Sequence, residues 1–252
     1  MTNTTIGIIG SGMIGANVAR LAIAAGLDIV ICNSRGPETL SELISDLGSN
    51  ANAATIEDVI NSSDLIVLAV PFPAYTNLPV DLLAGKTLID TLNYYPQRDG
   101  EMPEVKTEHT ATSEMVQSHL ANSHVIRALN NVDFVRLLSS ARPAGASDRS
   151  ALPVAGNDPL SKDTVIKFLD KIGYDAFDMG PLSESWRSEP TTPVYVAPYM
   201  HSETSYVAQK VTVEIFKNAP GRTVTRDEVE ILVKAAVRHD KMFGKLPEFA
   251  QD

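Results

Sequence analysis

The sequence has a single cysteine among 252 residues, so an intrachain disulfide is excluded. Free thiols are typical of reducing compartments, and we therefore expect a cytoplasmic protein. Cys32 lies inside a short apolar run, which indicates a core residue rather than a nucleophile. Long apolar runs are also missing, because polar residues interrupt every stretch of the roughly 18 residues that a membrane helix needs. We expect no membrane span.

Basic residues are scarce as well. The chain carries 21 Lys and Arg against 31 Asp and Glu, which gives a formal net charge of -10. Such an acidic chain repels nucleic-acid phosphates unless its cations form a local stripe, and here they are scattered. The 5 histidines lack metal-ligand spacing with one another or with other ligand types. We predict no nucleic-acid partner and no metal site.

The chain does contain a regular alternation of strand-like and helix-like segments. Short β-branched runs such as Thr4–Ile9 and Leu27–Cys32 are typical of buried strands, and glycines or capping residues bound the intervening helical patterns. Further strands are predicted at 64–70, 87–90, 125–129, 152–155 and 174–178. This order predicts an α/β fold, a Rossmann-type doubly wound domain with a mainly parallel sheet, over residues 1–182.

Residues 183–252 are predicted to form a short C-terminal helical appendage. Thr225 and Glu228 have the spacing of a capping box, and an apolar helical face follows from Val229 to Val237. This extension is too short for a core of its own. We expect it to pack on the main domain or on a second copy of the chain, and a homodimer through this face is predicted.

The main motif is the run Gly10-Ser11-Gly12-Met13-Ile14-Gly15, which follows the first strand and opens a helix. Gly10 permits a tight turn, Gly12 lets a pyrophosphate approach the backbone, and Gly15 allows close helix–strand packing. Amide groups at the helix start then hold the phosphates. An ordinary strand-to-helix turn is the alternative. The position after a buried strand favours dinucleotide binding.

The second strand ends in Asn33-Ser34-Arg35. NAD-binding Rossmann domains usually carry an acidic residue here, which binds the ribose hydroxyls. Arginine instead offers a permanently charged fork for a phosphate, and serine adds a hydroxyl donor. The alternative is a solvated arginine next to Glu38. The missing acid favours NADP, with its 2′-phosphate on Ser34 and Arg35.

Ligands of open parallel sheets bind beyond the carboxyl ends of the strands. Residues at those ends are therefore predicted to line the nicotinamide side of the site, and they are Val70, Pro71, Asn93, Ala128 and Asn130. The two asparagines are candidates for binding a carboxamide or a substrate. Asparagine also caps turns and helices well, so a structural role is the alternative.

No acid–base set is recognisable, and we assign no catalytic residue from the sequence. Trp186, Arg187, Tyr195 and Tyr199 are candidates for an aromatic wall against a flat partner ring. Packing within a loop explains the same residues equally well.

Taken together, these motifs resemble the deazaflavin-dependent NADP oxidoreductase family. The resemblance extends from about Thr5 to Tyr199 and rests on the glycine run, the Asn33–Glu38 segment and three later motifs, which are Ala69–Pro71, Val125–Asn130 and Gly180–Leu182 with Trp186-Arg187. It implies hydride transfer between NADPH and a deazaflavin or flavin stacked on the nicotinamide. It also implies phosphate contacts from Ser11, Met13 and Ile14. Transfer between stacked rings depends on orientation more than on a proton donor.

Two other functions stay open at this point. One is an NADPH-dependent reductase of a small carbonyl or imine compound, and the other is a non-catalytic NADP sensor. A fold-level resemblance cannot choose the substrate. In each enzymatic case the expected partner is a small-molecule hydride acceptor.

Overall fold

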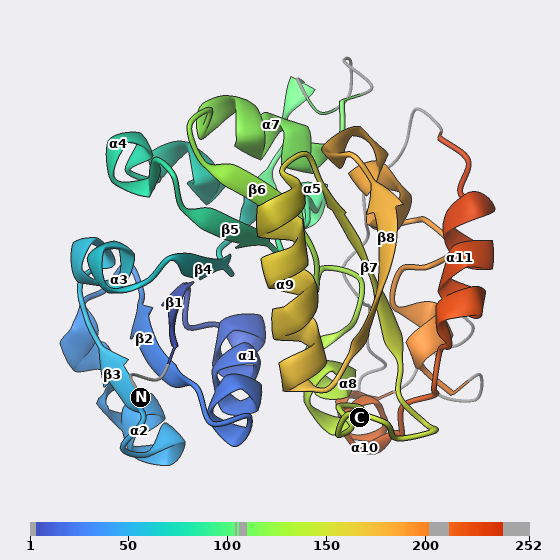
Figure 1. The fold of residues 1–252 in the computed structure, drawn as a ribbon, viewed down its shortest axis with the longest axis horizontal. Coiled ribbons are helices and arrows are strands. Elements are labelled where there is room, and N and C mark those ends of the chain that lie inside the picture. The colour runs from blue at the N-terminus through green and yellow to red at the C-terminus, as the bar shows by residue number, and fades with distance from the viewer. Residues whose placement is uncertain (1–3, 104, 106–109, 202–211, 239–252) are drawn as a thin grey trace.

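The computed structural model describes residues 4–103, 105, 110–201 and 212–238. Its centre is a single sheet of eight strands in the order β3-β2-β1-β4-β5-β6-β7-β8 (Figure 1). The strands are β1 (Thr5–Ile9), β2 (Asp28–Cys32), β3 (Ala51–Ala53), β4 (Leu65–Leu68), β5 (Thr87–Asp90), β6 (His124–Arg127), β7 (Ala151–Gly156) and β8 (Asp175–Gly180).

Helices connect most of these strands. The α-helices are α1 (Met13–Ala24), α2 (Ser41–Leu47), α3 (Ile56–Ser62), α4 (Val80–Leu83), α5 (Pro96–Asp99), α7 (Thr112–His119), α8 (Phe134–Ser139), α9 (Pro159–Ile172), α10 (Val213–Asn218) and α11 (Arg226–Lys234). Short 3-10 helices are η1 (Pro37–Leu40), η2 (Phe72–Asn77), η3 (Leu182–Ser188) and η4 (Ala197–Tyr199).

The sheet is covered on both faces because successive strand residues point to opposite sides. Ile6 and Ile8 of β1 belong to a core cluster that includes α1 and α9, whereas Ile9 packs in a second cluster with α3 and α7. Strands buried on both sides read as nearly continuous apolar runs, as β4 does with Leu65–Leu68. This arrangement explains why the sequence shows runs rather than alternation.

The strand order reverses between β1 and β4. β1 pairs in parallel with β2 on one side and with β4 on the other, so the chain moves outward in both directions from this point. Crevices at such reversals, beyond the carboxyl ends of the strands, are where these folds bind ligands. β7 runs antiparallel to β6, and β8 is parallel to β7. The predicted Rossmann-type, mainly parallel α/β fold is confirmed.

Several local features differ from the sequence prediction. The sequence pattern predicts one helix from Pro37 to Leu47, whereas the structure has a 3-10 turn over Pro37–Leu40 before α2. β3 has only 3 residues, too few for a periodic signal, and it escaped detection. α7 lies within a polar segment that the sequence left unassigned, because its first turn is buried by hydrogen bonds rather than by apolar side chains.

The C-terminal extension lies against the sheet in the region of β7 and β8 (Figure 1). Val229 and Val233 of α11 are buried in the main core cluster, while Val237 is 75% exposed. Most of the apolar face that suggested a dimer contact is thus covered by the chain's own strands. The homodimer stays a prediction. The sequence pattern of Ser205–Phe216 fits either a strand or a helix. Residues 205–211 lie outside the described residues, and Val213–Asn218 is helical.

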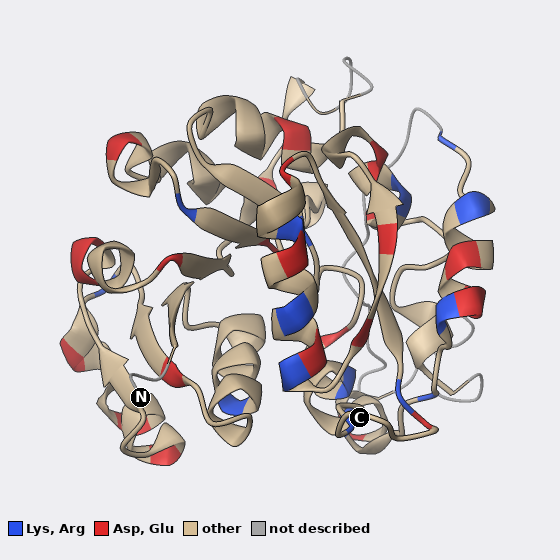
Figure 2. Cartoon of the chain, in the orientation of Figure 1, with Lys and Arg blue, Asp and Glu red and all other residues tan. Residues whose placement is uncertain are grey.

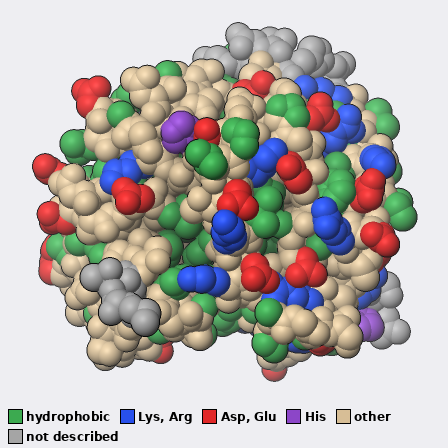
Figure 3. All heavy atoms as spheres, in the orientation of Figure 1, with side chains coloured by type: hydrophobic (Ala, Val, Ile, Leu, Met, Phe, Trp, Pro, Cys, Tyr) green, Lys and Arg blue, Asp and Glu red, His purple; other side chains and the backbone are tan. Residues whose placement is uncertain are grey.

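Charged residues are interspersed along the elements in Figure 2, and on the face shown in Figure 3 basic side chains lie among acidic ones. This pattern agrees with the absence of a basic stripe in the sequence. Among the described residues, none of the helices has the length and apolar character required to cross a bilayer.

The close packing of α1 against β1 gives a first prediction. An added Cβ at Gly15 would lie 1.9 Å from the Gly10 carbonyl oxygen, whereas nothing lies within 4 Å of a Cβ at Gly12. Because the obstructing atom at Gly15 belongs to the backbone, Gly15→Ala should destabilise the fold by about 2 kcal/mol or more. Gly12→Ala is the matched control and should change stability by less than about 1 kcal/mol. Urea unfolding midpoints test this, and equal midpoints for both variants would contradict it.

Candidate cofactor and active site

A cavity of about 540 Å³ opens at the carboxyl ends of β1, β4, β5 and β6. Its wall includes seven residues that the sequence predicted, and they are Gly12, Met13, Ile14, Val70, Pro71, Asn93 and Asn130. Segments distant in the chain thus meet at the reversal of strand order. The volume falls within the usual range of small-molecule sites.

The glycine run forms the rim of this cavity. Gly10 adopts φ +112°, its N–H donates to the Cys32 carbonyl at 3.0 Å, and a Cβ there would collide with the Ala69 carbonyl oxygen at 2.2 Å. These contacts require glycine at position 10 for the fold itself. Gly12 differs, since its φ of -70° suits any residue and its missing side chain would face open space. Its backbone is therefore left accessible to a ligand.

The N-terminus of α1 points into the same region. No side chain caps it, and its first turn carries no acidic residue. The first N–H groups of a helix have no intrahelical acceptor, and they carry the positive end of the helix dipole. A phosphate is well matched to such donors.

Asn33, Ser34 and Arg35 lie beside the glycine run but outside the cavity wall. The Asn33 amide nitrogen lies 3.4 Å from Ser11 Oγ and donates to Thr39 Oγ1 at 2.9 Å, and its oxygen accepts the Arg35 N–H at 2.9 Å. Asn33 therefore joins the end of β2 to the loop after β1. Ser34 and Arg35 are exposed, and within the described chain the Arg35 guanidinium has no hydrogen bond or ion pair.

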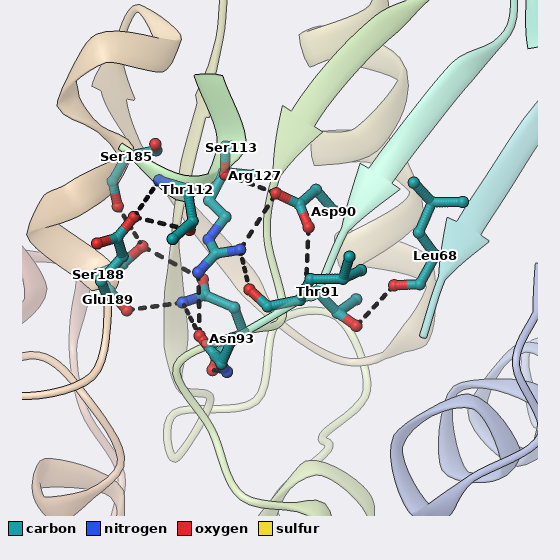
Figure 4. Close-up of polar contacts among 12 residues, drawn as sticks. Leu68, Asp90, Thr91, Asn93, Thr112, Ser113, Arg127, Ser185, Ser188 and Glu189 are labelled. Carbon is teal, nitrogen blue, oxygen red and sulfur yellow. Dashed lines mark hydrogen bonds and ion pairs between the residues drawn. The ribbon is translucent and has the colours of Figure 1, made fainter. Parts of the chain in front are cut away.

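The two asparagines of the prediction reach the cavity wall, yet their amides are engaged inside the protein (Figure 4). Asn93 Nδ2 donates to the Asn130 carbonyl at 2.8 Å, and Asn93 Oδ1 accepts from Arg127 Nη2 at 3.0 Å. Asn130 Nδ2 donates to the Ser188 carbonyl at 2.6 Å. These contacts hold the ends of β5 and β6 against η3, which corresponds to the structural alternative.

A buried ion pair lies directly beneath these asparagines. Arg127 and Asp90 are both 0% exposed, and Arg127 Nη1 lies 3.2 Å from Asp90 Oδ2. Arg127 also donates to the Leu92 carbonyl, while Asp90 accepts from Ser113 Oγ at 2.6 Å and from the Leu92 N–H at 2.9 Å. Figure 4 shows the guanidinium enclosed by β5, β6 and the start of α7. The network fixes the loop that carries Asn93.

The cavity wall also contains three residues that the sequence prediction missed, together with Tyr195, which was a candidate. Tyr95, Arg98 and Asp133 all line the cavity, and Tyr195 joins them from the loop after η3. The hydroxyl of Tyr95 is hydrogen-bonded to that of Tyr195, and the Arg98 guanidinium lies 5.0 Å from the centroid of the Tyr95 ring. The only sequence signal of Tyr95, Arg98 and Asp133 was their proximity to a strand end, since no acid–base spacing connects them.

Burial raises the pKa of two of these groups. Desolvation raises the pKa of Tyr95 despite the opposing hydrogen bond to Tyr195 and the nearby Arg98. It likewise raises the pKa of Asp133, against the effect of Arg136. Asp133 caps α8 through its Oδ1, and its Oδ2 is buried without a hydrogen-bond partner. The Tyr95 phenol is thus neutral at neutral pH.

Other predicted residues lie away from the cavity. Ala128 is fully buried in the core, and the next residue, Leu129, lines the wall instead. Of the aromatic candidates, only Tyr195 reaches the site, because Trp186 packs against Arg187 and Tyr199 is buried with its hydroxyl on the Ala151 carbonyl. Cys32 is buried, and its pKa is raised to about 11 by desolvation, as expected of a core thiol. Among the described residues, no cluster of ligands could hold a metal ion.

The buried ion pair gives a second prediction. Asp90→Asn removes one charge and leaves Arg127 enclosed without its counterion, so we expect a loss of about 3 kcal/mol or more in the free energy of unfolding. The control is Asp64→Asn, which breaks an exposed pair with Lys86 at 2.9 Å and should leave the unfolding midpoint close to that of the wild type. Chemical denaturation measures both. A stable Asp90→Asn variant would show that the pair is not needed to hold the strand ends.

Comparisons with known proteins agree with this geometry. Residues 5–94 match the family described as NADP oxidoreductase, coenzyme F420-dependent. Over 78 residues the chain is 40% identical to a glyoxylate reductase of Thermococcus kodakarensis, and the alignment covers 31% of this chain and 22% of that enzyme.

Two solved structures share the fold at low sequence identity. A hypothetical protein of Sinorhizobium meliloti, SMa0349, superposes with a TM-score of 0.67 at 23% identity, covering 77% of this chain and 93% of that one. A proposed F420-dependent NADP reductase of Arthrobacter sp. FB24 gives a TM-score of 0.59 at 22% identity, covering 71% and 86%. Coenzyme F420 is a deazaflavin, so the family resemblance seen in the sequence is confirmed for the segment that carries the glycine run. The match to the coenzyme F420-dependent NADP oxidoreductase model is confined to residues 5–94 of this chain.

Proposed function

We propose that the protein binds NADP(H) along the glycine run and transfers a hydride between its nicotinamide and a deazaflavin or flavin in the cavity. The observation that carries this proposal is the pairing of an open Gly12 backbone at the start of α1 with the uncapped helix terminus beside the cavity. Among the described residues, no atom lies close enough to a Cβ at position 12 to require glycine there. A pyrophosphate against the backbone supplies the reason.

The choice of NADP over NAD rests on the end of β2. The position where NAD-binding domains carry an acid is occupied by Asn33, whose amide serves the loops rather than a ribose. Beside it, Ser34 and Arg35 are exposed, and Arg35 is uncommitted among the described residues. A 2′-phosphate placed there receives a charged fork and a hydroxyl.

The cavity supports a planar acceptor. Apolar and aromatic side chains make up much of its wall, including Val70, Phe134, Tyr195 and Phe216. Hydride transfer between two rings needs both held in contact with water excluded, which such a wall provides. When bound, the nicotinamide supplies the hydride. The protein's part is to orient the two rings.

A small carbonyl or imine compound is the second candidate acceptor. The observation that favours it is the presence of the Tyr95 and Tyr195 hydroxyls on the cavity wall, because reduction of a polar double bond consumes a proton as well as a hydride. A sensor without turnover has no comparable use for these groups.

The first experiment is a fluorescence titration with NADPH and with NADH, followed by addition of 5-deazariboflavin or riboflavin to the bound NADPH. We expect NADPH to bind more tightly than NADH and to be oxidised by one of these acceptors. Oxidation by a carbonyl or imine compound alone would favour the second candidate. Binding without oxidation by any acceptor would refute the enzymatic proposal, and absence of binding would refute the interpretation of the glycine run.

The 2′-phosphate contact gives its own prediction. Arg35→Ala should weaken NADPH binding by about 2 kcal/mol, because a charged hydrogen-bond pair is lost, and should leave NADH binding nearly unchanged. Exposed Arg226 of α11, at the other side of the molecule, provides the matched control Arg226→Ala (Figure 1). Dissociation constants for both nucleotides decide the matter. Equal weakening of NADPH and NADH by Arg35→Ala would show that Arg35 does not contact the 2′-phosphate.

A further inference from the structure

Two tyrosines from distant segments meet on the cavity wall. Tyr95 follows β5, Tyr195 lies 100 residues later in the loop after η3, and their hydroxyl groups are hydrogen-bonded to each other. Both side chains line the cavity and both are only partly buried. Two tyrosines that line one cavity are thus joined through their hydroxyl groups.

The backbone holds Tyr195 in place at an energetic cost. Val196 adopts φ +53° and ψ -57°, and the Ala197 N–H donates to the Tyr195 carbonyl at 2.6 Å, which makes a γ-turn of the strained, positive-φ kind. A β-branched residue in this conformation is a genuine outlier. Leu129, on the same cavity wall, also has a positive φ of 62°. Strain of this kind persists where surrounding structure enforces it, and it concentrates at functional sites.

Asn131 is the residue that enforces the turn. It is fully buried, its carbonyl accepts the Val196 N–H at 2.8 Å, and its amide nitrogen donates to the Val194 carbonyl at 3.1 Å and to Tyr199 Oη at 3.0 Å. The loop is therefore clamped on both sides of Tyr195. The backbone that carries Tyr195 is thus attached to the end of β6.

The buried network orients a third group toward the pair. A guanidinium only donates hydrogen bonds, so the Asn93 atom facing Arg127 at 3.0 Å must be the amide oxygen. The Asn93 amide nitrogen is then directed to the other side, where it lies 3.5 Å from Tyr195 Oη in a long hydrogen bond. A hydroxyl that accepts a hydrogen bond from one neighbour is a better hydrogen-bond donor to the next. The same hydrogen bond stabilises the phenolate form of the pair.

We propose that the Tyr95–Tyr195 pair is the proton donor of the hydride-transfer reaction, an inference that rests on the proposed function. The C4–H bond of the nicotinamide breaks with its electron pair and a C–H bond forms on the acceptor carbon. The O–H bond of one tyrosine breaks while an N–H or O–H bond forms at the conjugated nitrogen or oxygen of the acceptor. The resulting phenolate takes the proton of its tyrosine partner, which recovers one from water. The acceptor is reduced by two electrons and NADPH is oxidised to NADP⁺.

Asp133 is the competing acid on the same wall. Its Oδ1 is held by the N–H groups of Val135 and Arg136 at 2.9 Å and 3.1 Å, and the Arg136 side chain lies 3.3 Å away. These donors hold the carboxylate as a helix cap. The Tyr95 and Tyr195 hydroxyls are bonded to each other instead, so the geometry favours the tyrosines.

The test separates proton transfer from hydride transfer by the choice of acceptor. 5-Deazariboflavin takes a hydride and a proton, whereas the flat 10-methylacridinium cation takes a hydride and needs no proton. Tyr95→Phe and Tyr195→Phe should each lower the rate of NADPH oxidation by 5-deazariboflavin about 100-fold, the range of a lost general acid. Their rates with 10-methylacridinium, above the uncatalysed background, and their dissociation constants for NADPH should stay within about 3-fold of the wild type. The double variant should be little worse than either single variant, because the pair acts as a unit.

Two controls complete the design. Tyr75→Phe removes a hydroxyl from a buried tyrosine outside the cavity wall and should leave both rates unchanged. Asp133→Asn tests the competing acid, and the inference requires that this variant does not lose the deazariboflavin reaction selectively over the methylacridinium reaction. For the wild type alone, a solvent deuterium isotope effect of at least about 2 with deazariboflavin and none with methylacridinium supports the same conclusion without any variant.

The outcomes are distinguishable from failure of the proposed function. A wild type that oxidises NADPH with neither acceptor refutes the proposed function. If the wild type turns over both acceptors while the phenylalanine variants slow both equally, the tyrosines only shape the cavity and the proton-donor inference falls. It also falls if Asp133→Asn, rather than the tyrosine variants, abolishes the deazariboflavin reaction selectively.

Discussion

The arrangement of the site depends on the buried contact between Asp90 and Arg127. These residues end neighbouring parallel strands, and both charges are withdrawn from water. An ion pair of this kind contributes little net stability, yet neither partner can be removed alone without leaving an uncompensated charge. The remaining donors and acceptors of the pair then determine its surroundings. Ser113 connects α7 to Asp90, and the Leu92 N–H fixes the turn after β5. Asn93 connects Arg127 to the cavity wall.

The network also explains why two asparagines at strand ends are present in a ligand site without facing the ligand. Their side chains serve as rigid connectors between β5, β6 and the loop that follows η3. A hydrogen-bonded scaffold of this kind is stiff, because every member loses its partners if one moves. Orientation of two rings in contact is a demand that such a scaffold suits. Gly12 and the two tyrosines line the same cavity.

The C-terminal extension is more closely connected with the site than its description as an appendage implies. Val196 and Phe216 come from this part of the chain and line the cavity, and α11 lies against β7 and β8. The Phe216 carbonyl accepts a hydrogen bond from buried Arg136 at 2.8 Å, and the ring lies 4.6 Å from the same guanidinium. The cavity is thus completed by residues from both predicted segments. Residues 5–94 carry the family signature, and the later residues shape the pocket in which an acceptor would bind.

The features of the fold and the site that have a local cause could be predicted from the sequence. Continuous apolar runs such as Leu65–Leu68 located the sheet. The glycine run at Gly10–Gly15 and the end of β2 at Arg35 predict a dinucleotide loop and a preference for NADP. Contacts between polar residues that are distant in the sequence depend on the tertiary structure. Tyr95 and Tyr195 are 100 positions apart and carry no periodic or spacing signal, and the strained turn at Val196 exists because buried Asn131 enforces it from another strand end. Long-range contacts of this kind follow from strand order and side-chain packing, which no local pattern encodes.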